Sequence, residues 1–237
     1  MSMLGHYASY PIMREGELIE CPCHGSEGHI GLFDRHNCSP IGAIHVGAWD
    51  CAEKGCYSPL FGDNVIYIEA NPYTYNNLTL PSIHNAPNSF QSDFKYGNPN
   101  WKSYNCTIFN EDDVLVNLSN QGDTSHIKLN NINLSEGLQV KTKKLDTLIS
   151  EENIDMNNYN FLNIDIEGGE LKALQGFENN INYINYIMAE VSTEKKQEYA
   201  CTLDEITKYL KTKGFELAEI SDSINTLKWG DAFFIKK

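Results

Sequence analysis

The chain has 237 residues and a formal net charge of −14, with 18 lysines and arginines against 32 aspartates and glutamates. This length suits one large α/β domain. No segment reaches the ~20 consecutive apolar residues that span a bilayer. The sequence also lacks a cluster of basic residues of the kind that binds nucleic-acid phosphates. We therefore expect neither a membrane partner nor a nucleic-acid partner.

The N-terminal part of the sequence differs from the rest. Residues 1–40 show weak hydrophobic periodicity and predict an N-terminal extension, followed by one domain of residues 41–237. The start has no basic segment followed by an apolar one, so we expect no signal peptide and a cytoplasmic location. A homodimer formed through the extension is a further expectation.

Seven cysteines are spread along the chain. Their odd number favours free thiols in a reducing compartment over a disulfide framework. The run Cys21-Pro22-Cys23-His24 invites a zinc site, but its spacing is not the usual one and no second pair follows it. A loop with thiols that bind no metal is the favoured interpretation.

Short apolar runs predict the strands of the domain. The runs are continuous rather than alternating, which is typical of parallel strands that are buried on both faces. In chain order, we expect strands at residues 43–46, 65–68, 105–109, 161–164 and 186–191, followed by a closing pair at 215–220 and 232–235.

Helical patterns lie between several of these strands, at residues 145–149, 170–177 and 203–213. The last is the clearest, because Thr202 and Glu205 match a capping box and Gly214 follows the helix. Alternation of strands and helices predicts an α/β fold with a doubly wound, mostly parallel sheet and a C-terminal antiparallel hairpin. Two further predictions are a long irregular segment at 73–104, which would shape an acceptor pocket, and a small hairpin at 117–133.

Two carboxylates follow the predicted strand at 161–164. Asp165 and Glu167 come directly after it, and two glycines and a helical pattern come next. The carboxyl ends of the strands form the ligand crevice of open α/β sheets, so both side chains are candidate catalytic groups. Structural roles, as helix caps or ion pairs, are the alternative.

A glycine turn and a later acid form a second pair of motifs. Gly47-Ala48 follows the first strand and lets the backbone pass close to a ligand. Cys51 stands where a dinucleotide fingerprint has a glycine, which argues against a pyrophosphate loop and a nicotinamide oxidoreductase. Glu69 ends the second strand about 20 residues later, the spacing that places a carboxylate on ribose hydroxyls. A helix N-cap is the alternative role for Glu69.

Taken together, these motifs resemble an FkbM-type S-adenosylmethionine-dependent methyltransferase. The resemblance extends from Ile41 to the C-terminus, and the D-x-E-G-x-E pattern is its most specific part. It rests on Ile44–Ala48, Glu69–Pro72, Leu145–Leu148, Ile164–Leu171 with Leu174 and Gly176, and Trp229–Phe234. The chain departs from the family pattern at Trp49 and Cys51.

The resemblance implies a seven-stranded Rossmann-like methyltransferase sheet, S-adenosylmethionine as cofactor, and O-methylation of a hydroxyl on a sugar, glycan or related small molecule. Gly47 and Ala48 would line its methionine part, and Glu69 would hold the ribose. The full set of implied cofactor-binding residues is His45, Gly47, Ala48, Glu69, Asn71, Asn105, Ser125 and Asp165.

Asp165 and Glu167 are the candidate catalytic residues. An alcohol is a poor nucleophile at neutral pH, so a positioned base is expected, and two neighbouring carboxylates raise one pKa. Alternatively, they would hold a divalent cation such as Mg²⁺ that acidifies the hydroxyl. His45 and Glu190 also end strands and are further candidates, although a lone histidine there is more often structural.

Two other functions stay open at this point. One is a catalytically degenerate methyltransferase fold that serves as a scaffold or assembly partner. The other is a methyltransferase that acts on protein or on an RNA cap.

Overall fold

The computed structural model describes residues 8–14, 17–23, 28–84, 97–119, 127–128, 137–195 and 200–237. Within these ranges, no helix is both long enough and apolar enough to cross a membrane. The description below concerns these residues.

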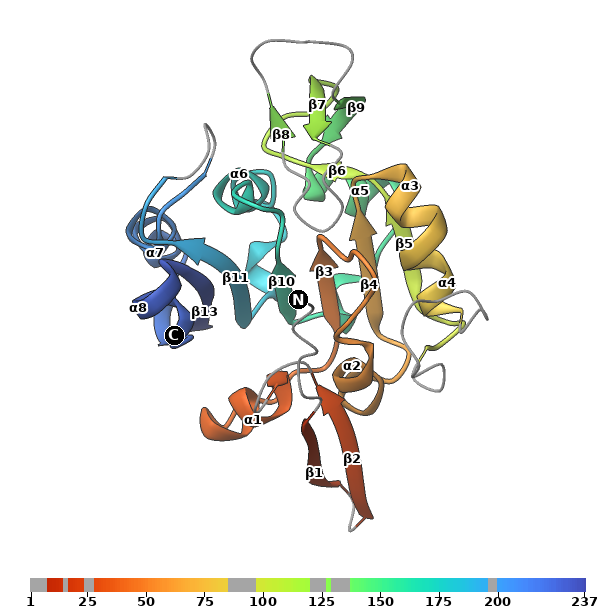
Figure 1. Cartoon of the computed structure of the whole chain (residues 1–237), viewed down its shortest axis with the longest axis vertical. Helices are drawn as coiled ribbons and strands as arrows, with labels where there is room; N and C mark the ends of the chain where they lie inside the picture. The colour runs from red at the N-terminus through yellow and green to blue at the C-terminus, as the bar shows by residue number, and fades with distance from the viewer. Residues whose placement is uncertain are drawn as a thin grey trace, which may run out of the picture.

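A seven-stranded sheet forms the centre of the molecule (Figure 1). Its strand order is β12-β13-β11-β10-β3-β4-β5. Strand β13 is antiparallel to both neighbours, and the other adjacent pairs are parallel. The predicted fold class, a mostly parallel sheet with a C-terminal antiparallel hairpin, is confirmed. The strands are β3 (Ala43–Val46), β4 (Val65–Glu69), β5 (Lys102–Asn105), β10 (Phe161–Ile164), β11 (Tyr186–Ser192), β12 (Phe215–Ile220) and β13 (Trp229–Lys236).

Helices cover both faces of this sheet. Every residue of β3, β4 and β10 is buried, as expected for continuous apolar runs between two helical layers. On one face the strands pack with α5, α6 and α7, and on the other with α1 and α2. The helices are α1 (Gly28–Arg35), α2 (Lys54–Phe61), α3 (Pro72–Thr74), α4 (Leu80–Ile83), α5 (Leu145–Glu151), α6 (Glu170–Gln175), α7 (Leu203–Thr212) and α8 (Ser223–Leu227).

Helix α7 begins and ends as the sequence predicts. The Thr202 hydroxyl accepts a hydrogen bond from the Glu205 backbone, and the Glu205 carboxylate accepts one from the Thr202 backbone. This capping box satisfies two amide groups that a helix start leaves without partners. Gly214 follows the helix with a φ of +86°, a conformation that glycine adopts without strain.

The predicted strand at 105–109 is wrong as a single strand. Strand β5 ends at Asn105, and the chain then enters a second sheet through β6 (Thr107–Ile108). The reason is burial, because the residues of β5 are mostly polar and form an edge of the main sheet, whereas Ile108 packs in the core.

The segment at 73–104 is more regular than predicted, because residues 72–83 are helical. Asn71 caps their start, since its side chain accepts hydrogen bonds from the Tyr73 and Thr74 backbones. Pro72 occupies the first helical position, where its missing N–H costs nothing. Asn-Pro was therefore a helix-start signal that the long-loop prediction overlooked.

A second, smaller sheet lies beyond the carboxyl ends of the central strands, at the top of Figure 1. Its order is β6-β9-β7-β8, and β7 pairs antiparallel with β8. This pair confirms a hairpin within residues 117–133. The further strands are β7 (Leu115–Ser119), β8 (Ile127–Lys128) and β9 (Gly137–Lys143).

The N-terminal residues form a hairpin of β1 (Ala8–Arg14) and β2 (Glu17–Cys23), followed by α1. Phe33 of α1 is buried and contacts the rings of Phe161 and Phe233 edge-on. The division into an extension of residues 1–40 and a domain of residues 41–237 stays a prediction.

Five cysteines have described side chains. Cys38, Cys51, Cys106 and Cys201 are free. Cys56 is disulfide-bonded, so the expectation of free thiols is wrong at that position.

Candidate functional site

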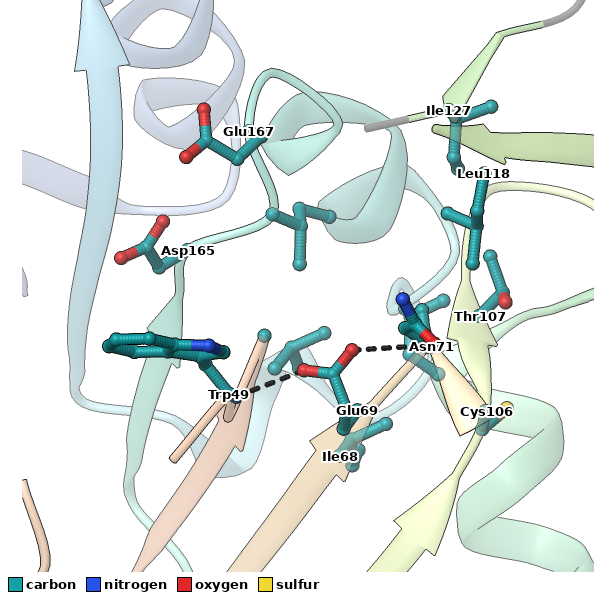
Figure 2. Close-up of a pocket in the computed structure, with 15 residues that line it drawn as sticks. Trp49, Ile68, Glu69, Asn71, Cys106, Thr107, Leu118, Ile127, Asp165 and Glu167 are labelled. Atoms are coloured by element: carbon teal, nitrogen blue, oxygen red, sulfur yellow. Dashed lines mark hydrogen bonds between the residues drawn. The ribbon is translucent and has the colours of Figure 1, made fainter. Parts of the chain in front are cut away.

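A pocket lies at the carboxyl ends of the central strands, between the main and the small sheet (Figure 2). It is open to solvent and contains about 600 Å³ of space when that open part is included. The pocket is lined by Val46, Gly47, Trp49, Ile68, Glu69, Ala70, Asn71, Cys106, Thr107, Ile108, Leu118, Ile127, Asp165, Ile166 and Glu167. The predicted residues Gly47, Glu69, Asn71, Asp165 and Glu167 therefore meet in one place.

Gly47 brings the turn after β3 against the turn after β10. Its φ of +91° lies in the left-handed region that favours glycine. A Cβ built on it would lie 1.7 Å from the carbonyl oxygen of Asp165, which is far inside any contact distance. The fold therefore requires glycine here, because the backbone of Asp165 fills the space that a side chain would occupy.

Glu69 fixes two backbone segments of the pocket. Its carboxylate accepts hydrogen bonds from the Trp49 amide at 2.9 Å and the Asn71 amide at 2.8 Å, on separate oxygens (Figure 2). Burial raises the pKa of Glu69, although these amide donors oppose the shift. The N-cap role weighed for Glu69 belongs instead to Asn71. Each Glu69 oxygen keeps acceptor capacity for a ligand.

His45, predicted to bind cofactor, lies outside the pocket. Its neighbours in β3, Ile44 and Val46, face the core of α5 to α7, and successive side chains of a strand point to opposite faces. The His45 ring is 2% exposed and lies against Tyr57 and Tyr67. Burial, together with a smaller effect of nearby His29, lowers the pKa of His45 to about 3. His45 is thus a neutral core residue, neither a ligand contact nor a base.

Two other predicted cofactor residues, Ala48 and Asn105, are described by the structure and do not line the pocket. Ala48 is buried, and its backbone N–H bonds to the Ile68 carbonyl. The Asn105 side chain donates hydrogen bonds to the carbonyls of Glu69 and Ala70, so it stabilises the backbone of two residues that line the pocket. Ser125 lies outside the described residues.

The turn after β10 presents both predicted catalytic carboxylates. Asp165 is joined to β3, because its amide donates to the Val46 carbonyl. Glu167 has a φ of +58°, which is uncommon for a residue other than glycine. The pKa of the Asp165 carboxyl group is raised well above its usual range. The largest cause is the protein around it, which removes part of its hydration although the residue keeps contact with solvent. The charges of neighbouring carboxylates, above all Glu190, add to the shift.

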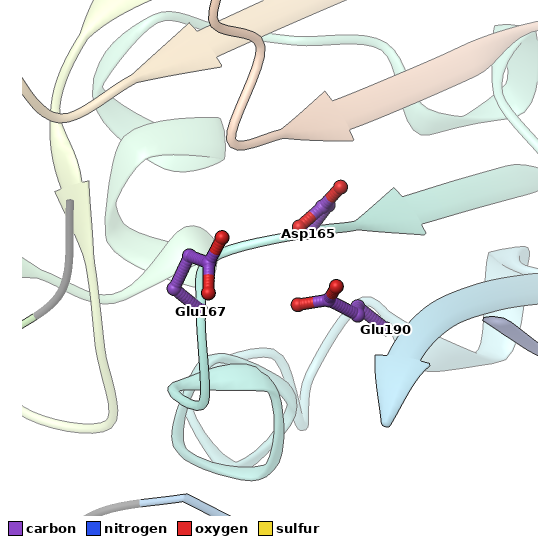
Figure 3. Close-up of side chains that lie close together, drawn as sticks. All are labelled: Asp165, Glu167 and Glu190. Carbon is purple, nitrogen blue, oxygen red and sulfur yellow. The ribbon is translucent and has the colours of Figure 1, made fainter. Parts of the chain in front are cut away.

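Glu190 of β11 joins these two residues to form an acidic cluster (Figure 3). Carboxylate oxygens of Asp165, Glu167 and Glu190 lie within 4.8 Å of one another. Like charges at this separation favour retention of a proton on one of them. Carboxylate oxygens are also the ligands that Mg²⁺ prefers. The cluster is therefore able to accept a proton or to hold a hard cation.

The other end of the pocket is apolar. In Figure 2, Leu118 and Ile127 lie opposite Trp49 and Asp165, with Glu69 between the two ends. Leu118 and Ile127 belong to the small sheet and were not predicted as site residues. The only sequence signal was the hairpin itself, which does not indicate where the hairpin packs.

Comparison with known proteins places this site in a family. Residues 41–217 match the family described as the Methyltransferase FkbM domain. The chain belongs to the FkbM methyltransferase family. No curated protein matches the chain.

Solved structures resemble the FkbM chain more weakly. A SAM-dependent methyltransferase from Aquifex aeolicus has 11% identity and a TM-score of 0.43, over 83% of this chain and 82% of that one. Magnesium protoporphyrin IX methyltransferase from Synechocystis PCC 6803, solved with bound SAH, has 9% identity and a TM-score of 0.46, over 87% and 79%. The functional assignment therefore rests on the family match and on the site.

Proposed function

We propose that this protein is an S-adenosylmethionine-dependent O-methyltransferase that acts on a hydroxyl of a sugar, glycan or related small molecule. The observation that carries the proposal is the convergence of Gly47, Glu69 and Asp165 on one pocket, in a chain that belongs to a methyltransferase family.

The pocket residues fit the cofactor by their chemistry. Glu69 offers acceptor oxygens for ribose hydroxyls, and the Gly47 backbone lines the pocket where we place the methionine part. The apolar end, with Leu118 and Ile127, suits a flat ring such as adenine. When bound, S-adenosylmethionine supplies a methyl group that is already activated on a sulfonium.

Asp165 is the residue we assign to the acceptor proton. Its raised pKa makes it a stronger base than an ordinary carboxylate, and catalytic bases work best with a pKa near the working pH. Glu167 and Glu190 each place a carboxylate oxygen within 4.8 Å of an oxygen of Asp165. A divalent cation such as Mg²⁺ on the acidic cluster is the alternative way to acidify the hydroxyl, and chelation with EDTA distinguishes the two.

Trp49 supports a carbohydrate acceptor. Its indole lies beside Asp165 in Figure 2 and is 39% exposed, although it lines the pocket. Its φ of +40° is unfavourable for a bulky residue, and such strain is concentrated at functional sites. An exposed aromatic face next to a base would stack on the C–H face of a sugar ring and present one hydroxyl.

Calorimetric titration with S-adenosylhomocysteine tests the cofactor assignment. We expect micromolar binding to the wild type and at least tenfold weaker binding to Glu69→Ala. Glu178→Ala is the control, because Glu178 is exposed and pairs with Lys213 away from the pocket. No binding to the wild type would refute the proposal and favour the scaffold alternative.

Methyl transfer from radiolabelled cofactor to a panel of acceptors tests the rest. The panel contains neutral sugars, amino sugars, an RNA cap analogue and a protein extract. We expect label in a sugar and loss of transfer in Asp165→Asn. Labelling of the cap analogue or of protein alone would refute the sugar assignment but not the methyltransferase.

A further inference from the structure

Glu170 is a buried acid directly behind the turn that carries Asp165 and Glu167. It is the first residue of α6 and is 1% exposed. One of its oxygens, Oε1, accepts hydrogen bonds from the Ile166 amide at 3.1 Å and from the Gly168 amide at 3.0 Å. The side chain therefore reaches back from the helix and holds the turn at two points.

The conformation of this turn is one that a free peptide rarely adopts. Glu167 and Gly168 have φ values of +58° and +107°, so two successive residues lie on the left-handed side. Backbone of this kind persists only where its surroundings over-determine it. On one side, Gly168 packs so closely on Ala200 that a Cβ would lie 3.1 Å from the Ala200 Cα. On the other side, the constraint is Glu170.

We propose that Glu170 is a positioning residue for methyl transfer, holding the turn at Ile166 and Gly168 so that Asp165 and Glu167 face the pocket. This inference rests on the proposed function, because it assigns Glu170 to the same site. Glu170 does not line the pocket, so it acts through the residues that do.

The two amides that Glu170 binds explain why an acceptor is needed at this position. Ile166 lines the pocket, and its amide lies between the two catalytic carboxylates in the chain. Without this acceptor, the amides of the half-buried residues Ile166 and Gly168 would lose the bonds that hold the turn. The turn would then shift to find other partners, and both carboxylates would move with it.

The second oxygen of Glu170 ties the turn to another segment. The Cys201 thiol lies 3.9 Å from Oε2, next to Ala200, which packs on Gly168. Burial raises the pKa of Glu170 to about 7, so it is partly protonated at neutral pH. Oε1 accepts its two amide bonds in either state, which means that an acceptor oxygen matters more than the charge.

Glu205 provides a matched control within the same chain. It also bonds to a backbone amide at the start of a helix, in the capping box of α7, but it does not line the pocket. Removal of either carboxylate leaves backbone amides next to a helix start without their acceptor. Only the loss of Glu170 should alter the pocket.

The test compares Glu170→Ala, Glu170→Gln and Glu205→Ala in the full chain, by calorimetry with S-adenosylhomocysteine and by amide hydrogen exchange. We expect Glu170→Ala to weaken binding about tenfold, because the Ile166 and Gly168 amides both lose their acceptor and the turn beside the pocket shifts. Exchange of the Ile166 and Gly168 amides should accelerate by a similar factor. Glu170→Gln keeps an acceptor oxygen and should stay within about threefold of the wild type.

Either of two results would overturn the positioning role. One is that Glu170→Ala and Glu205→Ala have equal affinities, and the other is that Ile166 and Gly168 exchange at the wild-type rate in Glu170→Ala. If the wild type itself does not bind S-adenosylhomocysteine, the proposed function fails, and the exchange rates still decide whether Glu170 holds the turn. If Glu170→Ala does not fold, Glu170→Gln and Glu170→Asp are compared with the wild type instead. The Ile166 and Gly168 amides should then exchange faster in Glu170→Asp, whose side chain is shorter, but not in Glu170→Gln.

Discussion

Gly47→Ala is the substitution for which the structure gives the sharpest expectation. The new methyl group would lie 1.7 Å from the Asp165 carbonyl oxygen and 2.6 Å from its carbonyl carbon. Both atoms are backbone, so no side-chain rotation relieves the overlap. The ends of β3 and β10 would have to separate by more than an ångström.

Gly214→Ala separates the two parts of the cost. Gly214 has a nearly equal φ, +86° against +91°, but a Cβ there would meet nothing within 4 Å. It therefore bears only the conformational penalty of a left-handed residue, about 1–2 kcal/mol. Gly47→Ala bears that penalty and the overlap as well, and we expect a total of about 3–5 kcal/mol, the size of an exceptional single substitution.

Urea unfolding and calorimetry together measure these effects. The free energy of unfolding should fall further in Gly47→Ala than in Gly214→Ala, and affinity for S-adenosylhomocysteine should fall at least tenfold in Gly47→Ala alone. Displacement of a site by about 1 Å is enough to cost two orders of magnitude in rate. Equal unfolding free energies and equal affinities in the two variants would refute the reasoning.

Two more predictions concern stability. Because the pKa of Glu170 rises from 4.5 to about 7 on folding, its contribution to stability is fully present below pH 4.5 and is lost as the pH rises through 7. Relative to Glu170→Gln, the wild type should lose about 3 kcal/mol of unfolding free energy between pH 4.5 and pH 8, and parallel pH profiles of the two proteins would contradict this. Phe33→Ala should cost about 3–5 kcal/mol, because Phe33 packs on Phe161 and Phe233. A cost below about 1 kcal/mol in denaturant unfolding, typical of a surface substitution, would show that α1 is not part of the core.

The sequence predicts best where local signals and burial agree. The apolar runs of β3, β4 and β10 are strands with nearly the predicted bounds, because residues buried on both faces leave a continuous apolar pattern. Gly47, Glu69 and Asp165 meet for a topological reason, since parallel strands end at one edge of a sheet.

The errors arise where a side chain's direction or its distant partner decides the outcome. His45 and Val46 are neighbours in one strand, yet only Val46 lines the pocket, and the motif alone does not show which face each residue takes. Leu118 and Ile127 reach the pocket through the packing of a separate sheet. Residues 105–109 cross from one sheet to another, a change that an apolar run does not reveal.

The place of β13 in the sheet has a consequence for synthesis on the ribosome. Strand β13 follows β12 in the chain but lies between β11 and β12 in the sheet. Until residues 229–236 have emerged, β11 lacks one neighbour and β12 has no partner among the described strands. Open strand edges of this kind pair with other chains. The nascent protein therefore exposes the edges of β11 and β12 until then, and this side of its sheet closes only after residues 229–236 have been released.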